Sequence, residues 1–335
     1  MTRWLLGLAA ALSVIAALSL RSDPAAAVWD DYANRLGRVL EQPLTLTPVA
    51  PVGILTPRSQ RRVALTESRT SLGKALALGP CGLVPLIAGN NNSLGKVAPA
   101  TAELVYTQQA LRLARACVAQ PPAAIQGTGA EDGLRALIAH RQSLWPQLLS
   151  NAVFAAPEFD RYFQSSAAAL GPDQVTSTGL GGLDDYLAIL GAADAGATLE
   201  LSALEQAAQR VQAAPTGATW INSQRLARHH LDTLTAAIDA HRLCQGPRTP
   251  EQGLLARTVF EAIYLDQVQP MLTTLDQRGR RLHELLSTHQ QQTGIVVDWL
   301  ATDWHPDQLR QATRAHALAW KNLLTACGLP IGTKP

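Results

Sequence analysis

Apolar residues recur every three or four positions over most of this chain, which is the spacing of helices that bury one face. The clearest examples are the ranges 28–42, 101–119 and 131–149. From residue 199 the same spacing continues almost to the C-terminus, with an interruption at Pro270. No segment shows sustained alternation of apolar and polar residues, so we expect little or no sheet. The pattern predicts an all-α fold built as a multi-helix bundle.

Groups of proline, glycine and polar residues divide this helical pattern. Residues 43–57 contain four prolines, so an extended linker is expected there. A polar loop is expected over 89–99, and a short strand or an extended link over 294–299. The remaining predicted helices are 63–78, 81–88, 157–170, 199–214, 219–243, 251–290 and 306–329.

A stretch of small residues near the middle of the chain predicts a boundary between two helical halves. The helical pattern is weakest over 171–183, and further small residues follow over 191–198. We therefore expect an N-terminal half over 28–193 and a C-terminal half over 194–335.

The first 27 residues have the pattern of an export signal. Arg3 provides a basic start, and the 17 residues from Trp4 to Leu20 form an uncharged, mostly apolar run. Ala25-Ala26-Ala27 offers small residues to a signal peptidase, and cleavage there would leave Val28 first. A membrane-spanning helix needs at least roughly 17 apolar residues, so an uncleaved inner-membrane anchor is the alternative. Both readings predict a periplasmic location for the rest of the chain.

Four cysteines, in an exported chain, predict disulfide bonds. They are Cys81, Cys117, Cys244 and Cys327, and no Cys-x-x-Cys motif occurs. Three connectivities are possible, and we favour Cys81–Cys117 and Cys244–Cys327, which place one bond in each half. The alternative is four buried free thiols.

The charge of the chain is almost balanced, with 28 basic and 26 acidic residues. A net charge of +2 gives no overall attraction to nucleic acid or to anionic lipid. We therefore expect no nucleic-acid partner, and membrane contact only through the N-terminal segment if it is uncleaved. Arg58, Arg61 and Arg62 form a small basic cluster that we expect to be solvated.

Known catalytic and cofactor motifs do not fit this sequence. The glycine-rich segment 89–97 has the wrong spacing for a phosphate-binding loop. His283 and His289 are six residues apart, which places them about 240° apart around a helix and excludes a shared metal ion. His230 and His241 share a helical face, for which a solvated surface is the expected role. We predict neither a metal nor a cofactor.

One polar segment remains as a candidate ligand site. Consecutive polar side chains between glycines can present many hydrogen-bond donors and acceptors to a ligand. The alternative is a structural role, in which these side chains fill turns and cap a helix. The candidate residues are Asn90, Asn91, Asn92, Ser93, Lys96 and Glu103.

Two parts of the chain resemble a known family. They are the stretch from Cys81-Gly82-Leu83 to Ser93-Leu94-Gly95-Lys96-Val97 with the helix ending at Cys117, and the segment from His316 to Trp320 that continues into Cys327-Gly328-Leu329-Pro330. Together they resemble a family of bacterial envelope proteins, the domain of unknown function numbered three-thousand-and-eighty. The resemblance implies an exported helical protein with paired cysteines. The chain departs from it in lacking a lipidation cysteine, and the resemblance implies no activity and no catalytic residues.

These observations support a non-catalytic binding or scaffold protein of the cell envelope, acting on an envelope partner or a small ligand. The alternative is a hydrolase of envelope polymers, with acidic or histidine groups that sequence spacing does not reveal. A third reading is an assembly subunit, for which the expected sign is an exposed helix face carrying Trp299 and Trp304.

Overall fold

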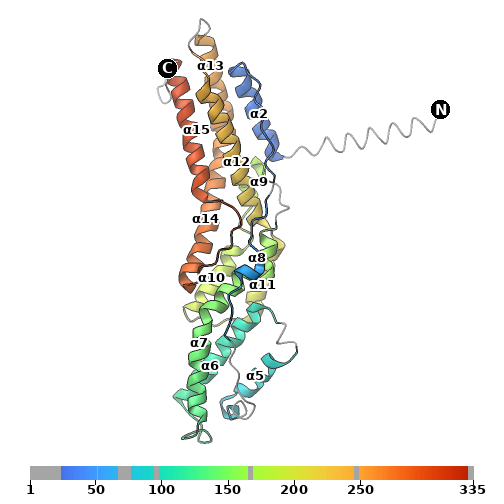
Figure 1. Ribbon diagram of the computed structural model, residues 1–335, viewed down its shortest axis with the longest axis vertical. Helices are drawn as coiled ribbons and strands as arrows, with labels where there is room; N and C mark the ends of the chain where they lie inside the picture. Colours follow the sequence, from blue (N-terminus) through green and yellow to red (C-terminus); the bar gives the residue numbers. More distant parts are fainter. Residues whose placement is uncertain are drawn as a thin grey trace, which may run out of the picture.

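Long helices run almost parallel to the long axis of an elongated molecule (Figure 1). The computed structural model describes residues 24–50, 52–66, 77–93, 98–164, 169–244 and 249–330. The elements are α2 (Pro24–Val39), α3 (Arg58–Arg61), η1 (Gly79–Cys81), α5 (Leu83–Asn91), α6 (Ala100–Ala119), α7 (Ala130–Phe154), α8 (Pro157–Tyr162), α9 (Pro172–Ser177), α10 (Leu183–Asp194), α11 (Leu201–Ala213), α12 (Thr216–Ala240), α13 (Thr249–Val259), η3 (Phe260–Val268), α14 (Gln269–Thr293) and α15 (Pro306–Ala326).

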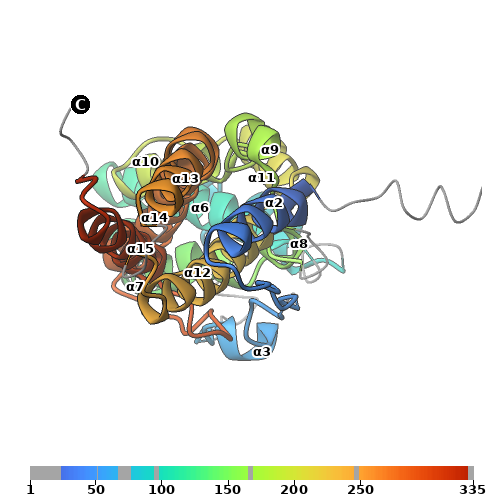
Figure 2. The same cartoon turned by 90° about the horizontal axis from the view of Figure 1, so that it is seen from above.

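The helices form two connected groups along the axis. At one end α12, α14 and α15 pack together, with α2 and α13 beside them (Figures 1 and 2). At the other end α6 and α7 form an antiparallel hairpin, against which the short α5 packs. Among the described residues there is no sheet, only an isolated antiparallel bridge between Leu55 and Leu300. The all-α prediction is therefore confirmed.

Helix α15 shows why the sequence folds locally as it does. His305 lies at its N-cap, where the ring Nδ1 accepts a hydrogen bond from the Asp307 backbone N–H at 3.3 Å. Pro306 follows at the first helical position, which needs no N–H donor. The buried positions recur at helical spacing and face α12 and α14. They are Pro306, Leu309, Ala312, His316, Ala319, Trp320, Leu323 and Leu324.

The interruption predicted at Pro270 takes the form of a π-helical segment. Proline lacks the N–H that would donate to the fourth preceding carbonyl, and its ring clashes with that carbonyl. Residues 260–268 adopt the wider π-helix immediately before it, and α14 then begins at Gln269. The chain therefore passes Pro270 without a break between α13 and α14.

Close contact between α12 and α14 depends on a glycine. A Cβ atom at Gly279 would lie 1.7 Å from Nε2 of Gln224, so only glycine leaves room for that side chain. Gln224 Nε2 donates to the Leu275 carbonyl at 2.5 Å, and its Oε1 accepts from Trp304 Nε1 at 2.7 Å. A buried amide thus joins the two helices to the segment that precedes α15.

Two extended segments cross the middle of the molecule and pair with each other. The described residues of the predicted linker, 43–50 and 52–57, form no helix, and α3 begins just after them. The Thr56 N–H of the linker donates to the Trp299 carbonyl at 3.0 Å, and the Ala301 N–H donates to the Ile54 carbonyl at 2.8 Å. Residues 295–299 are an extended link, one of the two predicted outcomes. Trp299 at the end of this link and Trp304 just before α15 are both buried, so the expectation of an exposed helix face that carries them is wrong.

Within the basic cluster, Arg58 and Arg62 are exposed as expected, whereas Arg61 is buried at 2% exposure. Its Nε donates to the Thr56 carbonyl at 2.9 Å, and its two terminal nitrogens bond the Phe154 carbonyl and the Asp160 carboxylate. Nearby, Arg58 Nε donates to the Ala155 carbonyl at 2.5 Å. These cations satisfy carbonyl groups at the C-terminal end of α7, where the helix dipole favours positive charge.

Several predicted boundaries differ from the structure. Residues 63–66 are extended rather than helical, because Asn151 pairs with both the N–H and the carbonyl of Val63 at 2.8 Å. Most of the remainder of that predicted helix, 67–76, lies outside the described residues. The polar loop expected from residue 89 begins later, because α5 extends to Asn91. The helix expected over 157–170 ends at Tyr162, and α10 was not predicted at all.

The predicted boundary between the halves falls at the end of α10. The larger apolar core contains side chains from both sides of it, from Trp29 to Leu324. A smaller core surrounds Cys81 and Cys117. The division into two domains therefore stays a prediction.

The predicted signal segment lies mostly outside the described residues. Its last four residues belong to α2, which begins at Pro24, and Ala25 is buried at 1% exposure. Cleavage before Val28 would therefore shorten α2 by one turn. Cleavage and anchoring both stay predictions.

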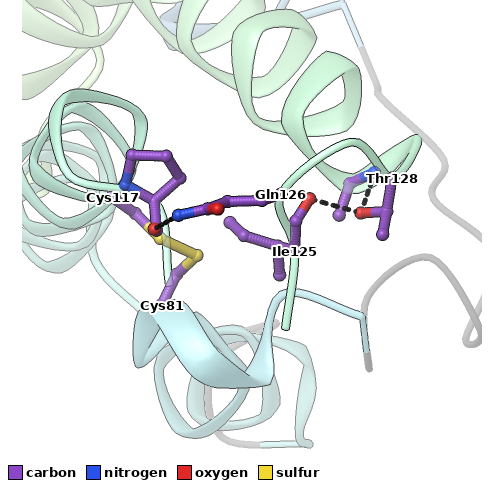
Figure 3. The surroundings of a disulfide bond; sticks show 7 residues. Cys81, Cys117, Ile125, Gln126 and Thr128 are labelled. Atoms are coloured by element: carbon purple, nitrogen blue, oxygen red, sulfur yellow. Dashed lines mark hydrogen bonds between the residues drawn. A yellow bond between two sulfur atoms is a disulfide. The ribbon is translucent and has the colours of Figure 1, made fainter. Parts of the chain in front are cut away.

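Two disulfides join the cysteines with the predicted connectivity. Cys81 pairs with Cys117 across η1 and α6, and Cys244 pairs with Cys327 beyond the ends of α12 and α15. Figure 3 shows the first bond, with Ile125 of the following turn beside it. That turn is held by the Gln126 side chain, which donates to the Pro121 carbonyl at 2.8 Å. The two bonds close loops with sequence separations of 36 and 83 residues.

We expect Cys81→Ser to release a single thiol. Unreduced, denatured protein should then react with iodoacetamide at Cys117 only, because Cys244 and Cys327 remain paired. Peptide mapping by mass spectrometry measures the label, with unreduced wild type as the unlabelled control. Alkylation of Cys244 or Cys327 in this variant would contradict the connectivity.

Candidate functional site

An open pocket of about 540 Å³ lies where the α6–α7 hairpin meets the connection between α10 and α11. Its volume lies within the range of small-molecule sites, ~300–1,000 Å³. The two helices of the hairpin and the more distant α10–α11 connection form its walls. The lining residues are Gln108, Gln109, Leu111, Arg112 and Arg115 from α6, Gln142 and Trp145 from α7, and Ala193, Asp194, Gly196, Thr198, Leu199 and Glu200 from the α10–α11 region.

Helix α6 contributes a polar stripe to the pocket. Gln108, Arg112 and Arg115 are spaced four and three residues apart, so they lie along one face of the helix. Ala110 and Ala114 lie on the opposite face and are buried, whereas the buried Leu111 lies beside the stripe and also lines the pocket. Both arginines are exposed, and within the part of the chain that the structure describes neither forms an ion pair. Their guanidinium groups are free to bind an anion.

Gln108 holds the α10–α11 connection in place. Its Nε2 donates to the Ala197 carbonyl at 2.7 Å, and its Oε1 accepts from the Leu199 N–H at 2.7 Å. Gly196 gives the connection its turn, with a φ of 102° that side-chain-bearing residues rarely adopt. The amide of Gln108 is therefore structural, and it fixes the position of this wall relative to α6.

Trp145 forms the wall that α7 contributes. Its indole Nε1 donates to Asp194 Oδ1 at 3.0 Å, which ties α7 to the end of α10. Trp145 is half-buried, whereas the other tryptophans that the structure describes are all buried. Because its N–H is already bonded, what Trp145 offers to a ligand is the apolar ring.

The predicted site residues lie elsewhere. Asn90 and Asn91 belong to the last turn of α5, Asn92 is its C-cap, and Ser93 is exposed just beyond. Lys96 lies outside the described residues. None of the described candidates, Glu103 included, lines the pocket.

Glu103 is engaged in a structural pair between α6 and α7. Its Oε1 accepts from Arg141 Nη1 at 2.7 Å, and the same arginine reaches Thr107 Oγ1 at 3.2 Å. The Arg141 guanidinium also lies 4.7 Å from the Tyr106 ring centroid and donates to its hydroxyl at 3.3 Å. Burial raises the pKa of Tyr106, and the positive charge of Arg141 opposes that shift. This cluster joins the hairpin rather than exposing Glu103 to a ligand.

The sequence did not predict this pocket, although the residues that α6 contributes to it form a recognisable pattern. The segment Gln108-Gln109 followed by Arg112 and Arg115 places long polar side chains at helical spacing on one face of a predicted helix. Trp145 and Glu200 carry no comparable signal, because only the tertiary fold brings them together.

A second cluster of titratable groups is closed to ligands. His316 Nε2 lies 2.5 Å from the Tyr32 hydroxyl, and His316 Nδ1 lies 2.8 Å from Thr235 Oγ1. Trp320 Nε1 donates to the same tyrosine hydroxyl at 2.7 Å. Burial lowers the pKa of His316 to about 3 and raises that of Tyr32, so both are neutral at pH 7. Fully buried and mutually bonded, these groups stabilise the fold.

The histidine face on α12 is not solvated as expected. His230 is buried beside Trp29, with ring centroids 5.4 Å apart, and His241 follows the helix in an extended conformation. Burial, with the nearby His229, lowers the pKa of His230 to about 4. Over the described ranges, no group of three or more histidine, cysteine or acidic residues could hold a metal ion. Over the same ranges, no helix is long and apolar enough to cross a membrane.

Comparison with protein families places the chain in one of them. A protein-family model described as "Protein of unknown function (DUF3080)" matches residues 29–331, which confirms the resemblance seen in the sequence. No curated protein and no solved structure matches the chain.

Proposed function

The chain belongs to the DUF3080 family, and we propose that it is a non-catalytic binding protein of the bacterial cell envelope. Its ligand is a small anion held in the pocket between α6, α7 and the α10–α11 connection. The observation that carries this proposal is the pair of exposed guanidinium groups, Arg112 and Arg115, on one wall of a pocket of about 540 Å³.

The compartment is supported by two independent features. Disulfides form and persist in oxidising compartments, and the structure contains two of them. The N-terminal 27 residues have the composition of an export signal or an N-terminal anchor. Both readings of this segment support a periplasmic location.

A hydrolase of envelope polymers is the second candidate, because two carboxylates also line the pocket. Glycoside hydrolysis uses one carboxyl group that burial keeps protonated and one that is ionised. Asp194 and Glu200 are both exposed, so nothing buries either as a general acid. Mass spectrometry of envelope glycan fragments incubated with the protein tests this candidate. Unchanged fragments support binding, and cleavage that Asp194→Asn or Glu200→Gln abolishes would establish the hydrolase.

Equilibrium dialysis tests the binding proposal. The probe is the low-molecular-mass fraction of a muramidase-treated bacterial envelope, and bound compounds are measured by mass spectrometry. We expect wild type to retain at least one anion. Arg112→Gln/Arg115→Gln should lower its retention at least tenfold, because charge-assisted hydrogen bonds each contribute about 1.5–3 kcal/mol.

A charge-matched variant controls for non-specific attraction. Arg135 and Arg314 are exposed and lie away from the pocket lining, so Arg135→Gln/Arg314→Gln should bind as wild type does. Failure of wild type to retain any anion, or equal loss in both double variants, would overturn the proposed function.

A further inference from the structure

We infer that the anion held by this pocket is a saccharide that carries a carboxylate. The inference rests on the proposed function and specifies its ligand. It follows from three kinds of group on the pocket walls: an apolar ring, two neighbouring guanidinium groups, and side-chain amides that form no hydrogen bond within the described residues. A carboxylate-bearing sugar is the class of small envelope molecule that engages all three together.

The ring of Trp145 calls for an apolar face on the ligand. Its N–H is held by Asp194 at 3.0 Å, so the rest of the indole contacts the ligand through carbon atoms. A sugar ring presents a face of C–H groups that packs against an aromatic ring, and this burial excludes water from both. A bare inorganic anion would leave the ring of Trp145 unused.

Arg112 and Arg115 call for a planar anion. They are three residues apart on α6 and therefore neighbours on its surface. A guanidinium group matches a carboxylate with two parallel hydrogen bonds, which gives orientation as well as affinity. A neutral sugar would leave both cations unpaired.

Gln109 and Gln142 supply the polar contacts that hydroxyl groups need. Neither amide forms a hydrogen bond within the described part of the chain, in contrast to that of Gln108. Each amide both donates and accepts, as a sugar hydroxyl does, so the two kinds of group are complementary. Glu200 adds a carboxylate that accepts from a further hydroxyl.

Tryptophan fluorescence of the full chain provides the readout. Trp145 is the half-buried tryptophan of the described residues, so ligand contact should shift its emission and protect it from acrylamide. The probes are glucuronic acid and N-acetylmuramic acid, with N-acetylglucosamine as the neutral sugar and lactate and phosphate as anions without a sugar ring. We expect at least one acidic sugar to bind at least tenfold more tightly than the neutral sugar and either simple anion.

Variants separate the contribution of the Trp145 ring to binding from that of Arg112 and Arg115. Trp145→Ala, measured by calorimetry, should weaken the acidic sugar at least tenfold and leave lactate binding unchanged. Arg112→Gln/Arg115→Gln should reduce the affinity for the acidic sugar to that for N-acetylglucosamine. Trp145→Phe keeps an apolar ring and should retain most of the affinity, although it loses the bond to Asp194.

Each contrary outcome has a distinct meaning. Equal binding of phosphate or lactate and the acidic sugars would overturn the saccharide and leave an anion site, as the proposed function requires. Binding of none of these probes, with an anion still retained from the envelope fraction, would also overturn the saccharide alone. Failure in both experiments would overturn the proposed function as well.

Discussion

Replacing Arg61 by methionine is expected to lower the free energy of unfolding by about 1–3 kcal/mol, because it removes a buried guanidinium group that donates to two backbone carbonyls and to the part-exposed Asp160 carboxylate. The guanidinium group bonds the carbonyls of Thr56 and Phe154 and the carboxylate of Asp160, and it lies 5.7 Å from the Phe159 ring centroid. Methionine keeps the apolar stem but leaves these acceptors without a donor. Equilibrium unfolding in urea, followed by far-UV circular dichroism, measures the loss.

The neighbouring arginine provides the matched control. Arg62 is exposed, so Arg62→Met should change the stability by less than about 0.5 kcal/mol. Arg61→Lys should fall between the two, because an ammonium group keeps the charge but not the planar fork. A stability of Arg61→Met within error of Arg62→Met would contradict the role assigned to the buried guanidinium.

The same residue shows what hydrophobic patterning does and does not predict. Helices α6, α7, α12 and α15 follow from apolar residues at helical spacing, and the structure confirms them. Arg61 was expected in water, because a charged residue in a proline-rich linker carries no signal of burial. Its burial is decided by the carbonyls at the end of α7, which lie more than ninety residues further along the chain.

Other differences have similar long-range causes. Residues 63–66 have helical composition, yet Asn151 pairs with the Val63 backbone as a neighbouring strand would. Helix α10 begins beside glycines and contains Gly191, so its propensity is low. Its buried positions, Leu183, Tyr186, Leu187 and Leu190, pack into the larger core and stabilise it there. Tertiary contacts override local preference in both cases.

The candidate site was less predictable than the fold. The asparagines after residue 89 were predicted as a ligand site because their polar side chains are adjacent in sequence. The pocket instead combines α6 with Trp145 and the α10–α11 connection, and Gln108 fixes their arrangement through two hydrogen bonds. Such a site has no sequence motif, because its groups are adjacent only in the folded chain.

Acid should destabilise this protein through its buried histidines. Burial lowers the pKa of His316 to about 3 and that of His230 to about 4, from an unfolded value of 6.5. Below pH 6.5 the unfolded chain therefore binds protons that the native state does not, so stability falls as the pH falls. Each histidine contributes about 1.4 kcal/mol per pH unit, or together about 5 kcal/mol between pH 7 and 4.5. Urea unfolding at half-unit pH steps measures this slope.

Two variants separate this proton linkage from simple destabilisation. His316→Gln removes one titrating group, so its stability should depend less steeply on pH, by about 1.4 kcal/mol per unit between pH 6 and 4.5. Leu324→Ala removes a buried side chain from the same helix and should lower the stability by about 2–5 kcal/mol at every pH, with the wild-type slope. Leu324→Ala therefore shows what a loss of stability without a change of slope looks like. If His316→Gln also gives a pH profile parallel to that of wild type, His316 is protonated equally in the folded and unfolded chains. That result would contradict the neutral, buried imidazole between Tyr32 and Thr235.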